Sequence, residues 1–456
     1  MRYFKHSSYW LTLFLCLWGS SLALQAQSPV LNEYIQLGIQ NNRSLQTQQL
    51  SYEKSKAALR EAKGMFMPYL SFNATYSLAG GGRTLDFPVG DLLNPINSTL
   101  NQLTETNAFP TNIENVNEQF APNNFQETKL RLIQPIYNPA LGINRKAKEA
   151  QIEIQANQRD AYQQELVRDI RLAYFSWLQT EEVLNIYKES EDLIKEIIRV
   201  NRSLVRNEKA TPVVISRSEF ELSKIRKDKS LAEAQSQTAR AYFNFLLNRP
   251  LETDIKKDEE VKEEEILLSM DQLSEQALNN RIEIAQLRSA QKAQQEAVNL
   301  NESAGIPRLN FVADGGFQGF GYDFGNQGYW LALVSLEWDL FTGNQRKARV
   351  QQSKLDQRSL QIREQELNSQ IQLQVRQNWY ELEAAKSRIK SDTQGLSAAK
   401  ESFRLTQKLY KENKASLLEL LDARTQFTQS QLTLTIDTYA LLSKQAELQW
   451  ASGEVR

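Results

Sequence analysis

Histidine and cysteine are almost absent from this chain of 456 residues, in which each occurs once, as His6 and Cys16. Both lie within the first 26 residues, so everything that follows contains neither residue. This absence excludes zinc sites built from cysteine and histidine, cysteine nucleophiles, Ser-His-Asp triads and disulfides from the rest of the chain. We therefore predict no enzyme activity, no cofactor and no metal site.

Long apolar runs are scarce as well. The only sustained one is Tyr9–Leu17, whereas a helix needs about 20 apolar residues to span a bilayer. Positive residues precede this run and small residues follow it, which is typical of a secretory signal. We predict a signal over residues 1–26, cleaved after Ala26. A lipid on Cys16 is not expected, because Leu15 stands where a small residue is wanted.

An excess of positive or negative charge is also lacking. The chain has 54 Lys and Arg against 55 Asp and Glu, a net charge of −1. No basic surplus therefore points to nucleic acid or to anionic lipid. An apolar content of 41% argues against a bundle of membrane-spanning helices.

Glycine and proline are missing from long stretches: no Gly occurs from Ile143 to Ala304, and no Pro follows Pro307. These stretches are rich in good helix formers. They predict long helices over 142–207, 212–248, 343–412 and 416–452. Steps of three or four between apolar residues predict coiled-coil packing in the third helix, along Leu367, Ile371, Val375, Leu382, Ala385 and Ile389, with Asn378 interrupting the seam.

Four short segments alternate apolar and polar residues, at about 69–78, 130–137, 308–318 and 330–341. About ten residues with one apolar side fit transmembrane β-strands between lipid and water. A small soluble sheet with one buried face is the alternative. The predicted lipid-facing residues are Leu70, Phe72, Leu132, Leu309, Phe311, Leu336 and Trp338.

The two halves of the chain resemble each other. Asn41-Asn42-Arg43 recurs as Asn279-Asn280-Arg281, and the segment 207–211 recurs as 412–416. We predict a first repeat over 27–250, an acidic and lysine-rich connector over 251–268, and a second repeat over 269–456. Each repeat runs helix, strand, long loop, strand, very long helix, turn, helix. The loop 79–126 is long enough to be external.

Four strands cannot close a barrel, and open sheet edges do not persist in hydrocarbon. Several chains must then share one barrel, and three chains give twelve strands, wide enough for a pore. The duplicated plan, the Asn-Asn-Arg segments, the strand-to-helix Phe341-Thr-Gly343 and the segment Tyr410–Ala423 resemble the TolC-type outer-membrane efflux family over about residues 28–452.

The resemblance implies a mainly α fold with a membrane β-barrel portion. It implies a homotrimer with a twelve-stranded barrel continued by a twelve-helix coiled-coil barrel in the periplasm. It further implies an outer-membrane exit duct that docks to a periplasmic adaptor and an inner-membrane transporter. Nothing in the sequence could hydrolyse ATP, so the duct would be passive.

The resemblance also implies a gate near the second helix turn. The family's paired acids correspond to Glu419 and Asp422, and its tip tyrosine corresponds to Tyr410. Arg217 stands at the first-repeat position equivalent to Asp422, so a bridge between them is a hypothesis for holding the tip shut. The family's turn Gly and Arg are replaced, here by Asn413 and Ala415. Adaptor-contact candidates at the two turns are Asn207, Glu208, Lys209, Glu412, Asn413 and Lys414.

The cargo stays open at this point: drugs, metals and other small molecules share this kind of conduit with type I protein secretion. A periplasmic coiled-coil scaffold is a further alternative, and it would wash off membranes with salt. For Glu419, Asp422 and Arg217 the plain alternative is a solvated helix face, and for Tyr410 it is packing at a coiled-coil crossing.

Overall fold

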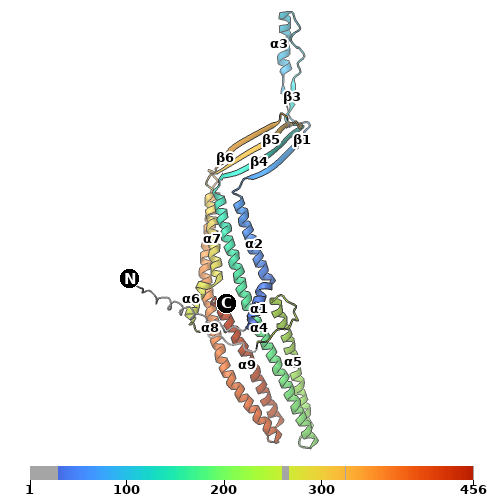
Figure 1. Ribbon diagram of the computed structural model, residues 1–456, viewed down its shortest axis with the longest axis vertical. Helices are drawn as coiled ribbons and strands as arrows, with labels where there is room; N and C mark the ends of the chain where they lie inside the picture. Colours follow the sequence, from blue (N-terminus) through green and yellow to red (C-terminus); the bar gives the residue numbers. More distant parts are fainter. Residues whose placement is uncertain (1–28, 259–265, 324, 455–456) are drawn as a thin grey trace, which may run out of the picture. The chain divides into compact units, whose positions relative to one another are not determined.

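The computed structural model describes residues 29–258, 266–323 and 325–454. The predicted signal, with Cys16, and part of the predicted connector lie outside the described residues. The helices are α1 (Pro29–Asn41), α2 (Arg43–Gly64), α3 (Val89–Thr104), α4 (Pro139–Arg206), α5 (Val213–Leu246), α6 (Met270–Asn280), α7 (Ile282–Ser303), α8 (Gln345–Lys411) and α9 (Leu417–Ala451). The strands are β1 (Tyr69–Ser77), β2 (Thr84–Phe87), β3 (Val116–Gln119), β4 (Phe125–Tyr137), β5 (Arg308–Phe320) and β6 (Gly328–Glu337) (Figure 1).

The chain divides into two compact units. The helical unit comprises residues up to Lys56, Ala150–Lys292 and the residues from Arg358 onward, and the strand unit comprises Ala57–Glu149 and Ala293–Gln357. None of the helices in the described residues is both long and apolar enough to cross a membrane.

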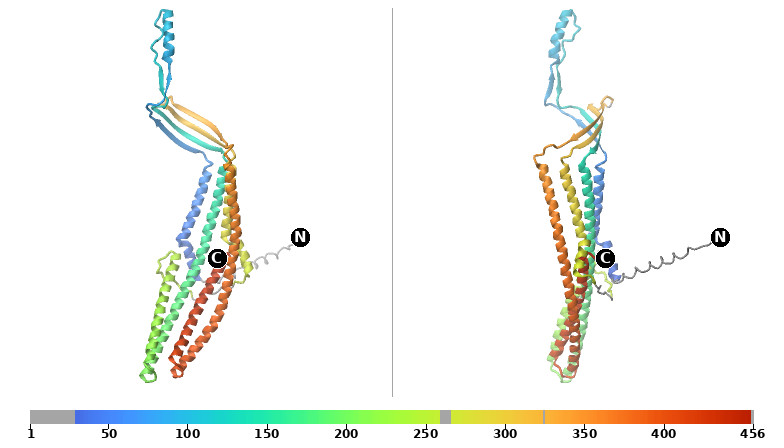
Figure 2. Two further views of the ribbon diagram at one scale, coloured as in Figure 1. Left: turned by 180° about the vertical axis from the view of Figure 1, so that it is seen from behind. Right: turned by 90° about the vertical axis from the view of Figure 1, so that its left-hand side faces the viewer.

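The helical unit contains two long antiparallel hairpins, α4 with α5 and α8 with α9 (Figures 1 and 2). The four long helices begin and end within three residues of the predicted bounds. α4 begins at Pro139, whose missing N–H costs nothing at a first helical position. The predicted seam of α8 is confirmed, since Ile371, Val375, Leu382 and Ala385 are buried together against α6, α7 and α9.

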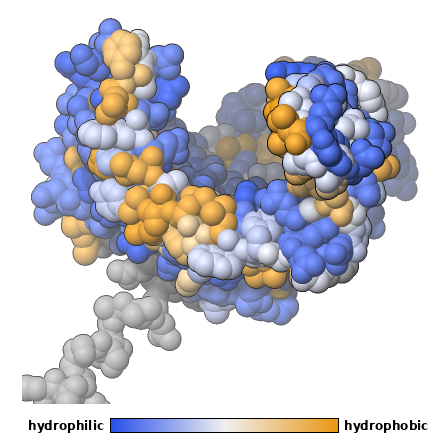
Figure 3. Space-filling model, turned by 90° about the horizontal axis from the view of Figure 1, so that it is seen from above, coloured by the Kyte–Doolittle hydropathy of each residue, from blue (hydrophilic) through white to orange (hydrophobic). Residues whose placement is uncertain are grey.

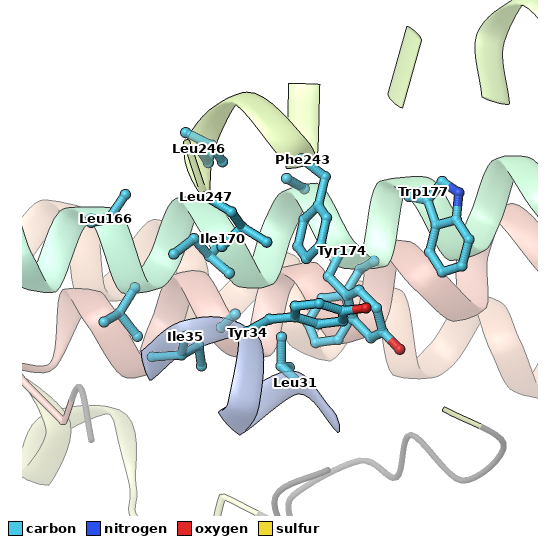
Figure 4. Packing of buried hydrophobic residues seen from close by; sticks show 14 of the residues in the cluster. Leu31, Tyr34, Ile35, Leu166, Ile170, Tyr174, Trp177, Phe243, Leu246 and Leu247 are labelled. Carbon is cyan, nitrogen blue, oxygen red and sulfur yellow. The ribbon is translucent and has the colours of Figure 1, made fainter. Parts of the chain in front are cut away.

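An aromatic core joins α1, α4 and α5 (Figure 4). The rings of Tyr34 and Phe243 meet edge to face at 5.1 Å, and Tyr174 lies beside both. The Tyr174 hydroxyl donates to the Lys256 carbonyl at 3.0 Å, and the Tyr34 hydroxyl accepts from the Lys256 N–H at 2.8 Å. Burial raises the pKa of Tyr174 to about 12. The described start of the connector is therefore fastened to the core rather than loose.

The internal repeat has a physical counterpart at its short helices. Between α1 and α2, Asn42 caps the second helix and its amide donates to the Leu246 carbonyl at 3.0 Å, at the end of α5. Between α6 and α7, the buried Arg281 donates to the Ala451 carbonyl at 3.1 Å, at the end of α9. Each repeat thus ties its helix break to the last carbonyls of its own final helix, which would otherwise lack partners.

The sheet of the strand unit is antiparallel, in the order β1-β4-β5-β6. Leu70 pairs with Leu132, Leu132 with Ala313, and Leu309 with Leu336. Paired residues and every second residue along a strand share one face. All six lipid-facing candidates within the strands therefore lie on one face: Leu70, Phe72, Leu132, Leu309, Phe311 and Leu336.

That face is exposed in the chain. Phe72 and Leu336 are 67% and 65% exposed. Figure 3, the view from above, shows apolar side chains (orange) at the surface of the molecule among polar ones (blue). The opposite face carries charged pairs beside apolar residues such as Ile133 and Val312. On it, Arg131 binds Asp314 through two hydrogen bonds of 2.8 and 2.6 Å, and Asp314 is buried beneath them. Lys129 and Glu127 form a further ion pair beside them.

Two strand predictions need correction. The strand predicted over 330–341 ends at Glu337, so Trp338 is not a strand residue; its ring N–H donates to the Gly305 carbonyl at 2.9 Å. The ladder stops there because the last pair is Arg308 with Glu337, and Pro307 before it has no N–H to continue. The strand predicted over 130–137 begins earlier, at Phe125, because β1 and β5 both pair with it that far.

The prediction of a loop over 79–126 is also wrong for the interior of that segment. It contains β2 and β3, which pair with each other, and the sixteen-residue helix α3 between them. The sequence of this segment is rich in Asn, Thr and Pro, which is typical of a loop. Here asparagines of α3 instead donate hydrogen bonds to the backbone of residues 109–113.

Candidate functional site at the helix turns

The two turns between the long helices have the same backbone geometry. Glu208 and Asn413 both take positive φ, 60° and 58°. After each, an N–H donates to a carbonyl five residues earlier: Lys209 to Leu204 and Lys414 to Leu409, both at 2.8 Å. This is the Schellman ending of a helix. The six adaptor-contact candidates lie in these turns, and all are exposed.

The predicted gate acids have different local roles. Glu419 forms a capping box with Ser416: its carboxylate accepts the Ser416 N–H at 2.6 Å, and the Ser416 hydroxyl accepts the Glu419 N–H at 3.2 Å. The backbone and hydroxyl hydrogen bonds of Ser416 lower the pKa of Glu419. Asp422 is exposed and accepts only a side-chain hydrogen bond, from Gln426 at 2.9 Å, among the contacts of the described chain. Both acids lie on the exposed side of α9.

Arg217 is exposed on α5. Within the described residues of one chain, no ion pair joins it to Asp422. Both side chains point into solvent from different hairpins, because the apolar and buried polar groups between α5 and α9 occupy the shared surface. A bridge between neighbouring chains stays a prediction.

Tyr410 is buried and belongs to the cluster where α4, α5, α8 and α9 meet. Its hydroxyl donates to the side-chain carbonyl of Asn201, which is fully buried. The Asn201 amide in turn donates to the Ser218 hydroxyl at 2.7 Å. Burial raises the pKa of Tyr410, so this hydroxyl keeps its proton. The tyrosine therefore links the second hairpin to the first through a buried polar chain.

Two buried charged residues of this region were not predicted from the sequence. Arg424 is 3% exposed; it donates to the Ser190 hydroxyl at 3.0 Å and lies 3.3 Å from the Glu221 carboxylate. Burial lowers the pKa of Arg424, and the charge of Glu221 opposes that shift. The available signal was an arginine on the apolar spacing of Leu417 and Leu421.

Glu191 on α4 is the second missed residue. Its carboxylate contacts Lys229 at 2.9 Å, Lys195 at 3.1 Å and Arg226 at 3.2 Å. Hydrogen bonds from Lys229, then Lys195 and Arg226, lower the pKa of Glu191 to about 2. One carboxylate thus fastens α4 to α5 through two cations of the partner helix.

Comparison with known families bears on the function of this chain. Residues 273–454, nearly the whole second repeat, match the family model of the outer membrane efflux protein. The second repeat therefore carries the outer membrane efflux protein domain. This match is to an efflux protein domain and not to an enzyme family. A search of curated proteins finds no sequence match.

Solved structures share the fold of this efflux protein. The CmeC outer membrane channel of Campylobacter jejuni aligns with a TM-score of 0.77 at 15% identity, over 93% of this chain and 86% of CmeC. The open-state MtrE outer membrane channel of Neisseria gonorrhoeae gives 0.72 at 18% identity, over 94% and 90%. The outer membrane protein VceC of Vibrio cholerae gives 0.71 at 14%, over 93% and 96%.

We predict that Tyr410→Phe destabilises the helical unit by about 1–2 kcal/mol, because it leaves the buried Asn201 carbonyl without its donor. Unfolding by denaturant, followed by helical circular dichroism, measures the change. Tyr380→Phe is the matched control, since Tyr380 is exposed on the same helix and should change stability by less than about 0.5 kcal/mol. Equal effects of the two variants would contradict a role for the buried hydroxyl.

The contribution of Glu191 should depend on pH. A carboxylate with a lowered pKa stabilises the fold above its unfolded value, near 4.5, and loses that effect as pH falls toward about 2. Glu191→Gln should cost about 1 kcal/mol at pH 7, after allowance for water at the exposed cations, and almost nothing near pH 2.5. Unfolding curves at the two pH values test this, with the exposed Glu189→Gln as control. A cost independent of pH would show that packing, not charge, is involved.

Proposed function

We propose that this protein is one subunit of a homotrimeric exit duct in the outer membrane. The observation that carries the proposal is a four-stranded sheet with an apolar face and unpaired edges at β1 and β6. Edges of this kind need partners in hydrocarbon. Pairing β1 of one chain with β6 of the next closes a ring, and three chains give twelve strands.

The two faces of the sheet support this arrangement. The exposed apolar face, with Phe72 and Leu336, suits lipid. The charged pairs of the opposite face, Arg131–Asp314 among them, suit a water-filled lumen. A soluble scaffold with small sheets would bury its apolar face, so the exposed one disfavours that alternative.

The two long hairpins would continue the duct into the periplasm. Their exposed turns, around Glu208 and Asn413, are the proposed contacts for a periplasmic adaptor that connects to an inner-membrane transporter. This transporter would supply the energy, because the duct itself is passive. We propose drugs, metals or other small molecules as cargo; protein secretion is the alternative. Deletion of the gene, followed by drug, metal and secreted-protein profiling, separates the two.

The apolar face can be tested inside the assembled protein. Phe72→Arg should lower the amount of trimer in the outer membrane several-fold, because an arginine at mid-bilayer costs about 2–4 kcal/mol. Asn73→Arg, its neighbour on the opposite face, is the matched control and should assemble normally. Light scattering in detergent measures the trimer, and planar bilayers measure its conductance. A monomer that is soluble without detergent would contradict the proposal.

The gate proposal places Arg217 of one chain against Asp422 of the next. Arg217→Glu should then raise single-channel conductance, because two like charges replace an attractive pair. The swapped variant, Arg217→Glu with Asp422→Arg, should return conductance toward the original value. Unchanged conductance and unchanged drug resistance in Arg217→Glu would rule the pair out.

A further inference from the structure

The segment Thr84–Phe120, which we call the arm, has regular secondary structure and is not an irregular loop. β2 and β3 form its base, in a register from Thr84 with Gln119 to Phe87 with Val116. α3 follows β2, and an extended segment returns from its end to β3 (Figure 2).

One face of α3 is fully occupied by the returning segment. Asn94 exchanges two hydrogen bonds of 2.8 Å with the Ile113 backbone, and Asn101 does the same with Phe109 at 2.7 and 2.9 Å. Between them, the Asn97 amide donates to the Pro110 carbonyl at 2.7 Å. Backbone approaches so closely here that a Cβ on Gly90 would lie 2.1 Å from the Ile113 oxygen.

The opposite face of α3 is apolar and uncovered. Leu92, Ile96 and Leu103 are 64%, 54% and 77% exposed in the described chain. At 3.6 residues per turn they lie on one stripe, about half a turn away from Asn94 and Asn101. Their spacing of four and seven is that of a coiled-coil seam. The helix therefore turns its polar side to its own chain and its apolar side outward, which is the reverse of an ordinary surface helix.

We propose that the apolar faces of α3 from three subunits pack against one another and form a three-helix bundle at the outer mouth of the duct. The inference rests on the trimer proposed above. The arm leaves β1, the edge strand, after Ser77 and rejoins the sheet at β4, so each arm is anchored next to a proposed subunit boundary. Closure of the barrel would bring three such arms to one rim.

Charge favours this occupant over a lipid surface. No Lys or Arg lies between Arg83 and Lys129, so the arm offers nothing to the phosphates of anionic lipid. Within α3 the only charged residue is Asp91, and Asn115 of the returning segment donates to it at 2.9 Å. Identical helices that meet at a symmetry axis bring identical side chains together, and the Leu and Ile stripe can do so without like-charge repulsion.

Cysteine cross-linking tests the bundle, because Cys16 is the only native cysteine and lies in the predicted signal. Ile96→Cys and Leu103→Cys should each give disulfide-linked dimers on oxidation of the detergent-solubilised trimer, with up to about two thirds of the subunits linked, as three-fold symmetry allows. Ser98→Cys, exposed on the opposite side of the same helix, is the matched control and should stay unlinked.

Separate readouts distinguish the possible failures. Light scattering on each variant reports the trimer itself: if no trimer forms, the proposed function fails. If the trimer is intact and Ile96→Cys stays unlinked, the bundle is wrong although the duct stands. Protection of that cysteine from maleimide only after transfer to lipid vesicles would assign the stripe to membrane and overturn the bundle. Equal cross-linking by Ser98→Cys would also overturn the bundle, because the helices would then not meet specifically through the apolar stripe.

Discussion

Every backbone N–H and C=O in hydrocarbon needs a hydrogen-bond partner, and a four-stranded sheet leaves two edges without one. This constraint connects the features of the strand unit. The sheet places the predicted lipid-facing residues on one exposed face and its charged pairs on the other. Such a sheet leaves a membrane wall unfinished, and the proposed trimer is the arrangement in which copies of the chain complete it.

The two repeats reach the same geometry with different chemistry. Asn42 and Arg281 both donate to carbonyls at the end of the last helix of their repeat, yet one is a neutral cap and the other a buried cation. Arg281 also pairs with Glu283 at 2.7 Å and stacks over the Trp450 ring at 4.3 Å. Burial raises the pKa of Glu283, but the hydrogen bonds and charge of Arg281 outweigh it, so its net pKa is lowered. The second junction therefore depends on charge pairing where the first depends on one hydrogen bond.

Local pattern predicted the long helices, their turns and the face of each strand, because helix formers without Gly or Pro and strict alternation act over short range. It failed where long-range contacts decide. The asparagines of α3 are loop residues by propensity, but Asn94 and Asn101 find backbone partners eight to nineteen residues away. Arg424 and Glu191 read as surface charges until the facing helices supply Ser190, Lys229 and the apolar surroundings. Trp338 continues the alternation, yet the pairing ends one residue earlier, at Glu337, because the partner strand β5 begins only after Pro307.

The proposed gate follows from the difference between the repeats rather than from their likeness. The positions equivalent to Glu419 and Asp422 in the first repeat are Val214 and Arg217, both 205 residues earlier. Because the Glu419 carboxylate is engaged in capping α9, Asp422 is the acid with more freedom to face a neighbour. In a trimer the first and second hairpins would alternate around the axis, so Arg217 and Asp422 would alternate as well. In a ring of alternating arginine and aspartate, neighbouring side chains attract one another, whereas in a ring of six acids they would repel one another. Asymmetry between the repeats would thus let the proposed duct close at its helix turns.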